Sequence, residues 1–350
     1  MGGMRARPPA ASLFMTLSLL APALAQGYDA SPAPQLKKLQ HLVGSWAGGG
    51  VMSEPTGQRG NWTMKSTYKW ALGGHFLQED FSWEVDGVEG AMVMRNYIGW
   101  DRERGRFVTA MINSQGRVGL HEVAVLPDGT LLTLQRHHQG GAPFQERARV
   151  RVEGDTLDLR VEMLMAEGKS LEVLGGELTR GGEGFAGDWG TAPWMGAPAG
   201  PGMVGLAKLA GTYETTGKMV MGPGMPETSI TGTDRWQMVF GGTAMHGTTR
   251  GQAAGAPDAY ESHALWGWDP HAQCLRTVYV DSMGQVGEMQ CRWHEGMLVS
   301  TMHGTQMGTP TTQRYVIRVD EQGHAESCQG HVMFGAGEPF LSFSANYARK

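Results

Sequence analysis

The sequence predicts an all-β protein built from two tandem antiparallel β-barrels. Three observations predict this fold: a long internal repeat, segments in which apolar and polar residues alternate with period two, and tight-turn signals at short spacing. Each copy of the repeat is too long for a solenoid unit. We therefore expect each copy to be a domain with its own core.

The repeat keeps a constant register. Gly73–Gly74 correspond to Gly241–Gly242, and the Gly-Trp-Asp motif at 99–101 recurs at 267–269. The turn motif that begins at Asn113 recurs at Asp281, so each pair is separated by 168 residues (241 − 73, for example). A single short match arises by chance, whereas a series in constant register indicates a duplication.

The elements follow from the pattern in chain order. A short helix leads into each copy, and strands with period-two alternation follow, separated by Asp-Gly turns. The expected helices are Pro34–Leu42 and Pro201–Leu209, and the clearest strands are Phe107–Ile112, Leu131–Arg136, Arg147–Val152 and Thr156–Glu162. Short hairpins form a meander, and a meander of about eight to ten strands closes into a barrel because closure removes unpaired edges.

The chain divides into four parts. Residues 1–25 have the positive start, short apolar run and small-residue cleavage site of a secretory signal, so we expect a periplasmic or secreted protein. The first barrel is expected at 34–180, a Gly-, Ala- and Pro-rich linker at 181–202, and the second barrel at 203–350. The apolar run is too short to span a membrane. The formal net charge of −5 disfavours a nucleic-acid partner.

The ends of each copy resemble the calycin pattern. Each copy opens with Gly-x-Trp or Gly-x-Tyr and ends near an arginine, which gives the pairs Trp46 with Arg180 and Tyr213 with Arg349. The resemblance to lipocalins implies that each aromatic ring packs under its guanidinium where the barrel closes. We expect a structural role for these four residues.

A closer resemblance covers both copies. The phrases L-x-x-L-x-G-x-W, W-x-L-G-G-x-F-L at 70–77, G-W-D and D-S-x-G are similar to an uncharacterised bacterial family of calycin-like domains, the domain of unknown function 1579. The second copy departs from it with two extra residues before Gly241–Gly242. The family implies the fold and no established activity.

Charge predicts which strand faces point inward. Arg147, Arg149 and Arg151 alternate with Ala148, Val150 and Val152, and burying three unpaired cations costs more than exposing three small apolar groups. We therefore place the arginines outside. The candidate lining of a ligand pocket, which we expect to exceed about 300 Å³, consists of Val150, Val152, Met163, Met165, Met219 and Met221.

Metal and haem sites are expected to be absent, and no cofactor is expected. Met219, Met221 and Met225 are soft ligands that suit Cu(I), but Met225 follows a Gly-Pro-Gly turn and methionine more often fills a core. Nitrobindin-type haem barrels, which resemble the opening phrase, bind iron through a histidine near the last strand. Here 171–180 and 340–350 contain no histidine. Copper and haem remain alternatives.

Cys274 and Cys291 flank the turn at Asp281. They face each other across a two-residue turn, but point to opposite faces if the turn is a type I turn with Gly284 as a bulge. Asp at the first position and Gly at the fourth favour the bulged turn. That geometry excludes a disulfide between them.

The function predicted from these patterns is an exported, non-enzymatic carrier or sensor that holds a small apolar or amphipathic ligand inside a β-barrel. The chain lacks a G-x-S-x-G elbow, a phosphate-binding loop, an H-E-x-x-H motif and a C-x-x-C motif. Two alternatives stay open. One is an enzyme, or a haem or copper protein, with its site inside one barrel; the other is a pair of solid barrels that bind another protein.

Overall fold

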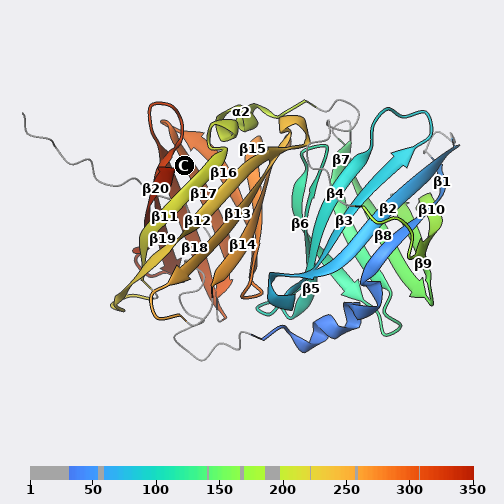
Figure 1. Cartoon of the computed structure of the whole chain (residues 1–350), viewed down its shortest axis with the longest axis horizontal. Helices are drawn as coiled ribbons and strands as arrows, with labels where there is room; N and C mark the ends of the chain where they lie inside the picture. The colour runs from blue at the N-terminus through green and yellow to red at the C-terminus, as the bar shows by residue number, and fades with distance from the viewer. Residues whose placement is uncertain are drawn as a thin grey trace, which may run out of the picture.

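The computed structural model describes residues 31–53, 59–139, 142–165, 169–185, 198–220, 222–256, 259–306 and 308–350. The proposed signal segment and the central part of the linker lie outside these residues. Two closed antiparallel barrels of ten strands each stand side by side, which confirms the predicted fold (Figure 1).

Each barrel is a meander in which every strand pairs with its neighbours in sequence and the last strand pairs with the first. A 3-10 helix at Pro34–Leu42 precedes the first barrel. Its strands are β1 (Gly44–Ser53), β2 (Arg59–Ala71), β3 (Phe76–Val85), β4 (Met92–Asp101), β5 (Arg106–Asn113), β6 (Val118–Val125), β7 (Leu131–Gln139), β8 (Ala142–Glu153), β9 (Thr156–Leu164) and β10 (Ser170–Arg180).

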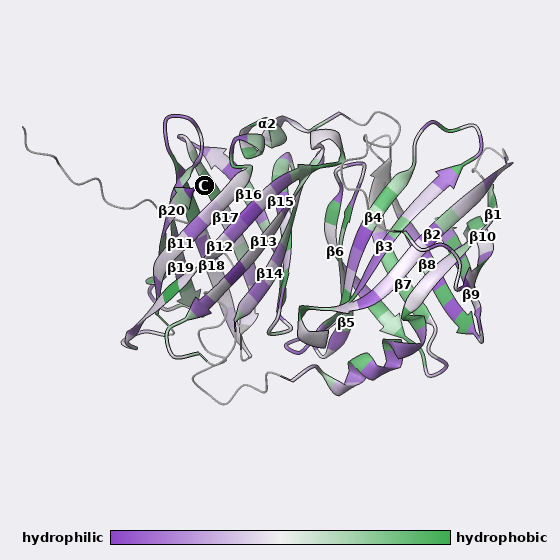
Figure 2. Cartoon of the chain, in the orientation of Figure 1, coloured by the Kyte–Doolittle hydropathy of each residue, from purple (hydrophilic) through white to green (hydrophobic). Residues whose placement is uncertain are grey.

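The second barrel repeats this order after helix α2 (Pro201–Lys208). Its strands are β11 (Gly211–Val220), β12 (Glu227–Val239), β13 (Ala244–Ala253), β14 (Tyr260–Asp269), β15 (Cys274–Asp281), β16 (Val286–His294), β17 (Met297–Gln306), β18 (Thr309–Val319), β19 (Ala325–Phe334) and β20 (Phe340–Arg349). Figure 2 shows hydrophobic and hydrophilic residues alternating along these strands, as expected when one face of a sheet is buried.

The duplication extends to backbone detail. Gly73 and Gly241 adopt nearly the same left-handed conformation, with φ of 67° and 63°. Asn113 Oδ1 accepts backbone N–H bonds from Gln115 and Arg117, both at 3.1 Å. Asp281 Oδ1 accepts the corresponding pair at 2.9 Å. The two copies therefore make the same turns with the same type of acceptor.

The aromatic–arginine pairs lie where each barrel closes. Trp46 pairs in register with Arg180, whose guanidinium carbon lies 4.2 Å from the centroid of the indole ring. Tyr213 pairs in register with Arg349, whose guanidinium donates to the Ala210 carbonyl at 2.8 Å. An arginine in this position satisfies carbonyl groups at the end of the lead-in helix.

Tyrosine replaces tryptophan without loss of a hydrogen bond. Trp46 Nε1 donates to the Leu42 carbonyl at 2.8 Å, and the Tyr213 hydroxyl donates to the Leu209 carbonyl at the same distance. Both acceptors lie four residues earlier in the chain. Each aromatic side chain thus ties the first strand to the helix that covers that end of its barrel.

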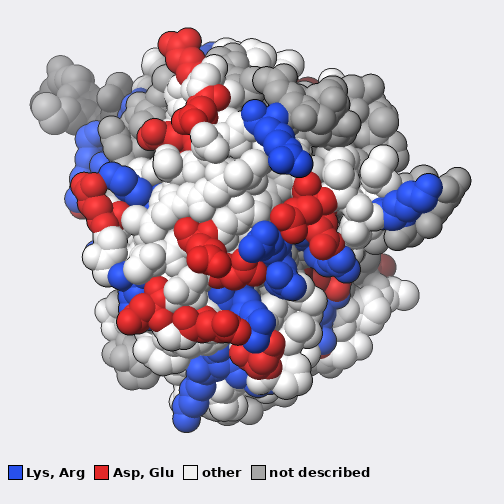
Figure 3. Space-filling model, turned by 90° about the vertical axis from the view of Figure 1, so that its right-hand side faces the viewer, with Lys and Arg blue, Asp and Glu red and all other residues white. Residues whose placement is uncertain are grey.

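The predicted orientation of β8 is correct. Val150 and Val152 pack against the core of the first barrel. The side chains of Arg147, Arg149 and Arg151 are 47–49% exposed. Arg147 pairs with Glu162 and Arg149 with Asp158, so the arginines belong to a mixed-charge outer wall. Figure 3 shows basic and acidic side chains interleaved on the end of the molecule that it faces.

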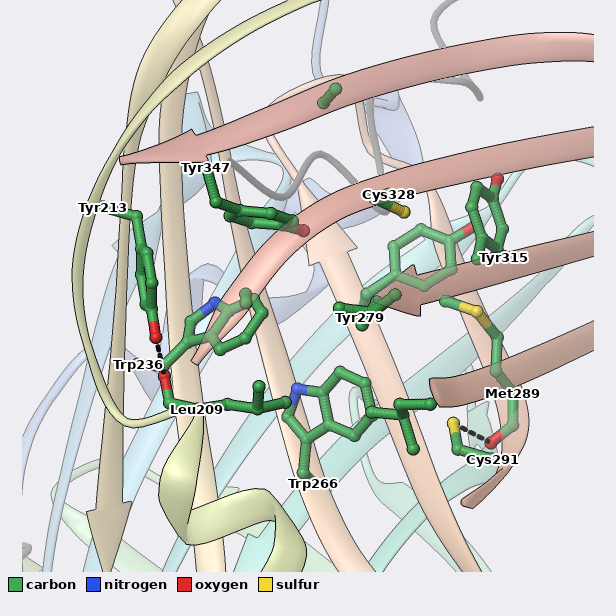
Figure 4. Close-up of a cluster of buried hydrophobic side chains, with 14 of the residues drawn as sticks. Leu209, Tyr213, Trp236, Trp266, Tyr279, Met289, Cys291, Tyr315, Cys328 and Tyr347 are labelled. Carbon is green, nitrogen blue, oxygen red and sulfur yellow. Dashed lines mark hydrogen bonds between the residues drawn. The ribbon is translucent and has the colours of Figure 1, made fainter. Parts of the chain in front are cut away.

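The two barrel interiors differ. The second is filled by large side chains: Tyr213, Trp236 and Tyr347 pack with ring centroids 5.6–6.1 Å apart, and Trp266 and Tyr315 are also buried (Figure 4). In the first, several inward-facing side chains retain partial exposure. They are Phe81, Trp83, Met94, Val150, Val161 and Met163.

All three cysteines are buried and free. Cys291 pairs in register with Leu275, so it cannot face Cys274. Gly284 has φ of 76°, as the bulged turn requires. Of the two turns considered, the bulged one that excludes the disulfide is therefore observed.

The barrels contact each other through reciprocal surfaces. A shared apolar cluster contains Phe76, Val93, Tyr97, Ala110 and Ile112 from the first barrel and Phe240, Ala244, Leu265, Val278 and Val280 from the second. A Cβ on Gly116 would lie 2.6 Å from the Thr243 carbonyl oxygen, and a Cβ on Gly284 would lie 2.7 Å from His75 Nδ1. Thr243 and His75 occupy equivalent positions in the repeat. The barrels therefore meet like the halves of a symmetric dimer.

Gly267 is expected to be essential to this contact. Its Cβ would lie 2.2 Å from the Gly116 carbonyl oxygen, so Gly267→Val should force the barrels apart and cost about 1–3 kcal/mol of stability. Calorimetry of the variant should show a lower transition temperature or two separate transitions. Thr231→Val, on an exposed strand position, is the control. An unchanged single transition in Gly267→Val would contradict the prediction.

Candidate functional site

A cavity of about 330 Å³ lies where the second barrel meets the first. Its inner wall comes from inward-facing residues of β15 to β18, among them Tyr279, Met302 and Gln313. Its outer wall comes from the turn at 101–106, between β4 and β5 of the first barrel, and from β6. Neither barrel forms this cavity alone.

The inner wall combines apolar surface with hydrogen-bonding groups. Tyr279 is buried; burial raises the pKa of its phenol well above the usual value, and its hydroxyl lies 3.9 Å from Met302 Sδ. The Gln313 side-chain oxygen accepts from the Tyr315 hydroxyl at 2.6 Å. This bond orients the amide and leaves its NH₂ group as a donor for another partner.

Two glycines shape the inner wall. A Cβ on Gly287 would lie 2.4 Å from the Tyr279 ring, so only glycine lets that ring occupy its position. Gly304 lines the cavity as well, and a Cβ there would meet nothing closer than Thr311 Oγ1 at 4.0 Å. The space in front of Gly304 is therefore available to another group.

Several charged groups that line the cavity form ion pairs. Arg104 forms an ion pair with Asp101 at 2.7 Å, and Arg106 pairs with Glu122. Glu288 pairs with Arg276 at 2.9 Å. Paired charges offer little net attraction to an ion, so the cavity suits an uncharged molecule that is partly apolar and partly hydrogen-bonding.

A buried carboxyl group lies inside the first barrel. Glu79 accepts hydrogen bonds from the Tyr68 hydroxyl and from Asn96 Nδ2, the latter at 2.6 Å. Burial raises the pKa of Glu79 in spite of these donors. Because the carboxyl group is already hydrogen-bonded, we assign it to the internal structure of the barrel.

The residues predicted to line a pocket lie elsewhere. Met163 is partly buried on the inner side of β9. Met219 is fully buried in the core of the second barrel. Met165 is 53% exposed, because it follows the end of β9 in a hairpin, so its prediction as an inward lining residue is wrong. Met221 lies outside the described residues, and neither Val150 nor Val152 lines the 330 Å³ cavity.

Sequence reasoning missed the cavity because its walls come from both copies. The Gly-Trp-Asp motif at 99–101 directly precedes the turn at 101–106, but from the sequence we used this motif only as a sign of the repeat and of the family resemblance. Tyr279 and Gln313 lie on different hairpins of the second barrel and follow no shared spacing. Among the described residues, no group of three His, Cys, Asp or Glu side chains could hold a metal ion.

Comparison with known families identifies the chain. The model of a protein family of unknown function, DUF1579, matches residues 31–180 and again 204–349. The chain belongs to this family. Both copies of the duplication are thus DUF1579 domains, and the predicted resemblance is confirmed. No curated protein sequence matches the chain.

Solved structures with similar folds give little further detail. Rv2717c from M. tuberculosis is 18% identical, with a TM-score of 0.33 over 43% of this chain and 99% of that one. The S-type phycobiliprotein lyase CPES from Guillardia theta is 12% identical, with a TM-score of 0.30 over 42% of this chain and 92% of that one. A DUF3598 protein of unknown function from Nostoc punctiforme is 9% identical, with a TM-score of 0.27 over 91% of this chain and 100% of that one. These scores are too low to support an argument about function.

No helix within the described ranges is both long enough and apolar enough to cross a membrane.

Proposed function

We propose that this DUF1579 protein is a non-enzymatic carrier or sensor for a small, uncharged, amphipathic molecule. The observation that carries the proposal is the 330 Å³ cavity at the mouth of the second barrel, roofed by the turn at 101–106. Its size lies at the lower end of the range for small-molecule sites. The paired charges and the amide of Gln313 favour a ligand with hydrogen-bonding groups and no net charge.

The location also supports regulation by the ligand. A molecule in this cavity contacts β15 to β18 on one side and the β4–β5 turn on the other. Binding energy would therefore favour the docked arrangement of the two barrels. We further propose that residues 1–25 direct export, so that the ligand would be met in the periplasm or outside the cell.

The neutral fluorescent probe N-phenyl-1-naphthylamine tests the site. We expect saturable binding with a stoichiometry of one and displacement by neutral amphipathic molecules such as fatty alcohols. Gly304→Phe should fill the cavity and weaken binding at least about tenfold, the effect of losing about 1.4 kcal/mol. Because a Cβ at Gly304 meets no close atom, the variant should keep its fold.

Thr301→Phe is the matched control, since Thr301 lies on the same strand but faces outward. It should bind the probe like the unmodified protein. Native mass spectrometry of protein purified from the cell compartment in which it resides would identify a ligand that stays bound. Absence of probe binding, or equal binding by Gly304→Phe, would overturn the proposed function and favour the protein-interaction alternative.

A further inference from the structure

A second cluster of functional side chains lies in the contact between the barrels. Tyr97 on β4 of the first barrel contacts His263 on β14 of the second, and His263 contacts His246 on β13. Tyr97 is completely buried, and the His263 side chain is 14% exposed. None of the three lines the 330 Å³ cavity.

Two heteroatoms lie within hydrogen-bond distance of the same nitrogen, His263 Nδ1. The Tyr97 hydroxyl oxygen lies 3.0 Å from His263 Nδ1, and His246 Nε2 lies 3.0 Å from the same nitrogen. The other ring nitrogen of His263, Nε2, lies 3.4 Å from Glu261 Oε1. The carboxylate therefore holds the proton on Nε2, which leaves Nδ1 with a single lone pair.

A single lone pair cannot satisfy both neighbours. The Tyr97 hydroxyl and an N–H at His246 Nε2 would compete for the one acceptor at His263 Nδ1. If His246 carries its proton on Nδ1 instead, two nitrogen lone pairs face each other at 3.0 Å. A cation that accepts electron pairs from all three atoms removes this conflict.

We propose that Tyr97, His246 and His263 form a site for a divalent transition-metal ion of borderline softness, such as Zn²⁺ or Cu²⁺. Two neutral imidazoles and the Tyr97 oxygen, which would release its proton to solvent as the ion binds, supply three ligands, and water would complete a four-coordinate ion. In a tetrahedral zinc site with Zn–N distances of roughly 2.0–2.1 Å, ligand nitrogens lie about 3.3–3.4 Å apart. The 3.0 Å between the two ring nitrogens therefore needs only a small adjustment.

The surroundings of the cluster match those of metal sites. The Glu261 carboxylate on the far nitrogen of His263 forms the carboxylate–histidine arrangement that orients metal-bound imidazoles. Arg95 hydrogen-bonds to the Tyr97 hydroxyl, and its positive charge is balanced by Asp80, which accepts a second hydrogen bond from it at 3.0 Å.

The duplication does not produce a second copy of this site. The positions equivalent to His263, His246 and Tyr97 in the other copy are Arg95, Gln78 and Leu265, which cannot form a matching site. We therefore expect one ion per chain. Because the ligands come from both barrels, the ion would link them.

Metal titration of the chelator-treated full-length protein tests the proposal. We expect one equivalent of Zn²⁺ to bind, and one equivalent of Cu²⁺ to give a visible phenolate-to-copper charge-transfer band. Tyr97→Phe should abolish that band. His246→Gln, which introduces the residue that the first copy carries at this position, should weaken binding by more than the 10–100-fold typical of outer-shell changes.

Glu261→Gln should weaken binding within that 10–100-fold range. His294→Ala, which removes a side chain that is 67% exposed, is the control and should bind as the unmodified protein does. Circular dichroism of each variant checks that the barrels are folded. Binding of less than one equivalent, or equal affinity in folded His246→Gln, would overturn the site and leave a purely hydrogen-bonded network.

Discussion

Replacement of Trp46 with alanine is expected to lower the free energy of unfolding by about 3–5 kcal/mol, the usual cost of deleting a buried tryptophan. The ring is fully buried, lies under the Arg180 guanidinium at 4.2 Å, and donates a hydrogen bond to the Leu42 carbonyl. Deleting it leaves a cavity, an uncovered cation and an unpaired carbonyl. Urea unfolding followed by circular dichroism measures the loss.

The second barrel provides the control for this prediction. Tyr213 already performs the same role with a smaller ring and a hydroxyl that reaches the Leu209 carbonyl. We therefore expect Trp46→Tyr to cost clearly less than Trp46→Ala, because it keeps most of the buried area and the donor. Equal losses in the two variants would mean that neither the hydrogen bond nor the cation–ring contact contributes to closure.

Much of the fold could be predicted because its determinants are local. Alternation along each segment specifies strands, and short polar turns specify hairpins. The charges of Arg147, Arg149 and Arg151 specify which face of β8 points outward. The closure of each barrel was predicted from the aromatic residue at the start of each copy and the arginine at its end. These features need no knowledge of how the two copies meet.

The sequence contains a sign of the contact between the barrels, but it is not the alternation of apolar and polar residues. β5 and β15 are buried on both faces along most of their length. Their sequences, Arg-Phe-Val-Thr-Ala-Met-Ile-Asn and Cys-Leu-Arg-Thr-Val-Tyr-Val-Asp, are correspondingly apolar at successive positions. A continuous apolar strand in an antiparallel barrel indicates that its outer face is also covered. The 330 Å³ cavity and the cluster at Tyr97 depend on this contact, so neither could be predicted from one copy.

The state of each interior could not be predicted either. Knowing which side chains point inward does not reveal whether their summed volume fills the barrel. In the second barrel the rings of Tyr213 on β11 and Trp236 on β12 meet the ring of Tyr347 on β20, which lies at the other end of the copy. In the first barrel, inward side chains such as Trp83 and Val161 remain partly exposed. This difference emerges only when all ten strands are assembled.

Asp281→Asn is expected to stabilise the protein above pH 7 and to remove part of its pH dependence. Burial raises the pKa of Asp281 from 3.8 to about 7 in the folded protein. Between about pH 4 and pH 7 the folded state therefore holds a proton that the unfolded state has lost, so stability falls as pH rises through this window and is constant above it. The full shift corresponds to at most about 4 kcal/mol at pH 8.

The first copy shows that asparagine suits this turn, because Asn113 accepts the two equivalent N–H bonds. The reciprocal variant Asn113→Asp should therefore lose stability at pH 8 and much less at pH 5. Thermal unfolding of the three proteins between pH 4 and pH 9 measures both effects. If the stability of Asp281→Asn changed with pH as steeply as that of the unmodified protein between pH 4 and pH 7, the Asp281 carboxyl group would have to be ionised in the folded state throughout that range. Its three donors, the Met283 and Gln285 amides and the Tyr260 hydroxyl, would then outweigh the cost of burying the charge.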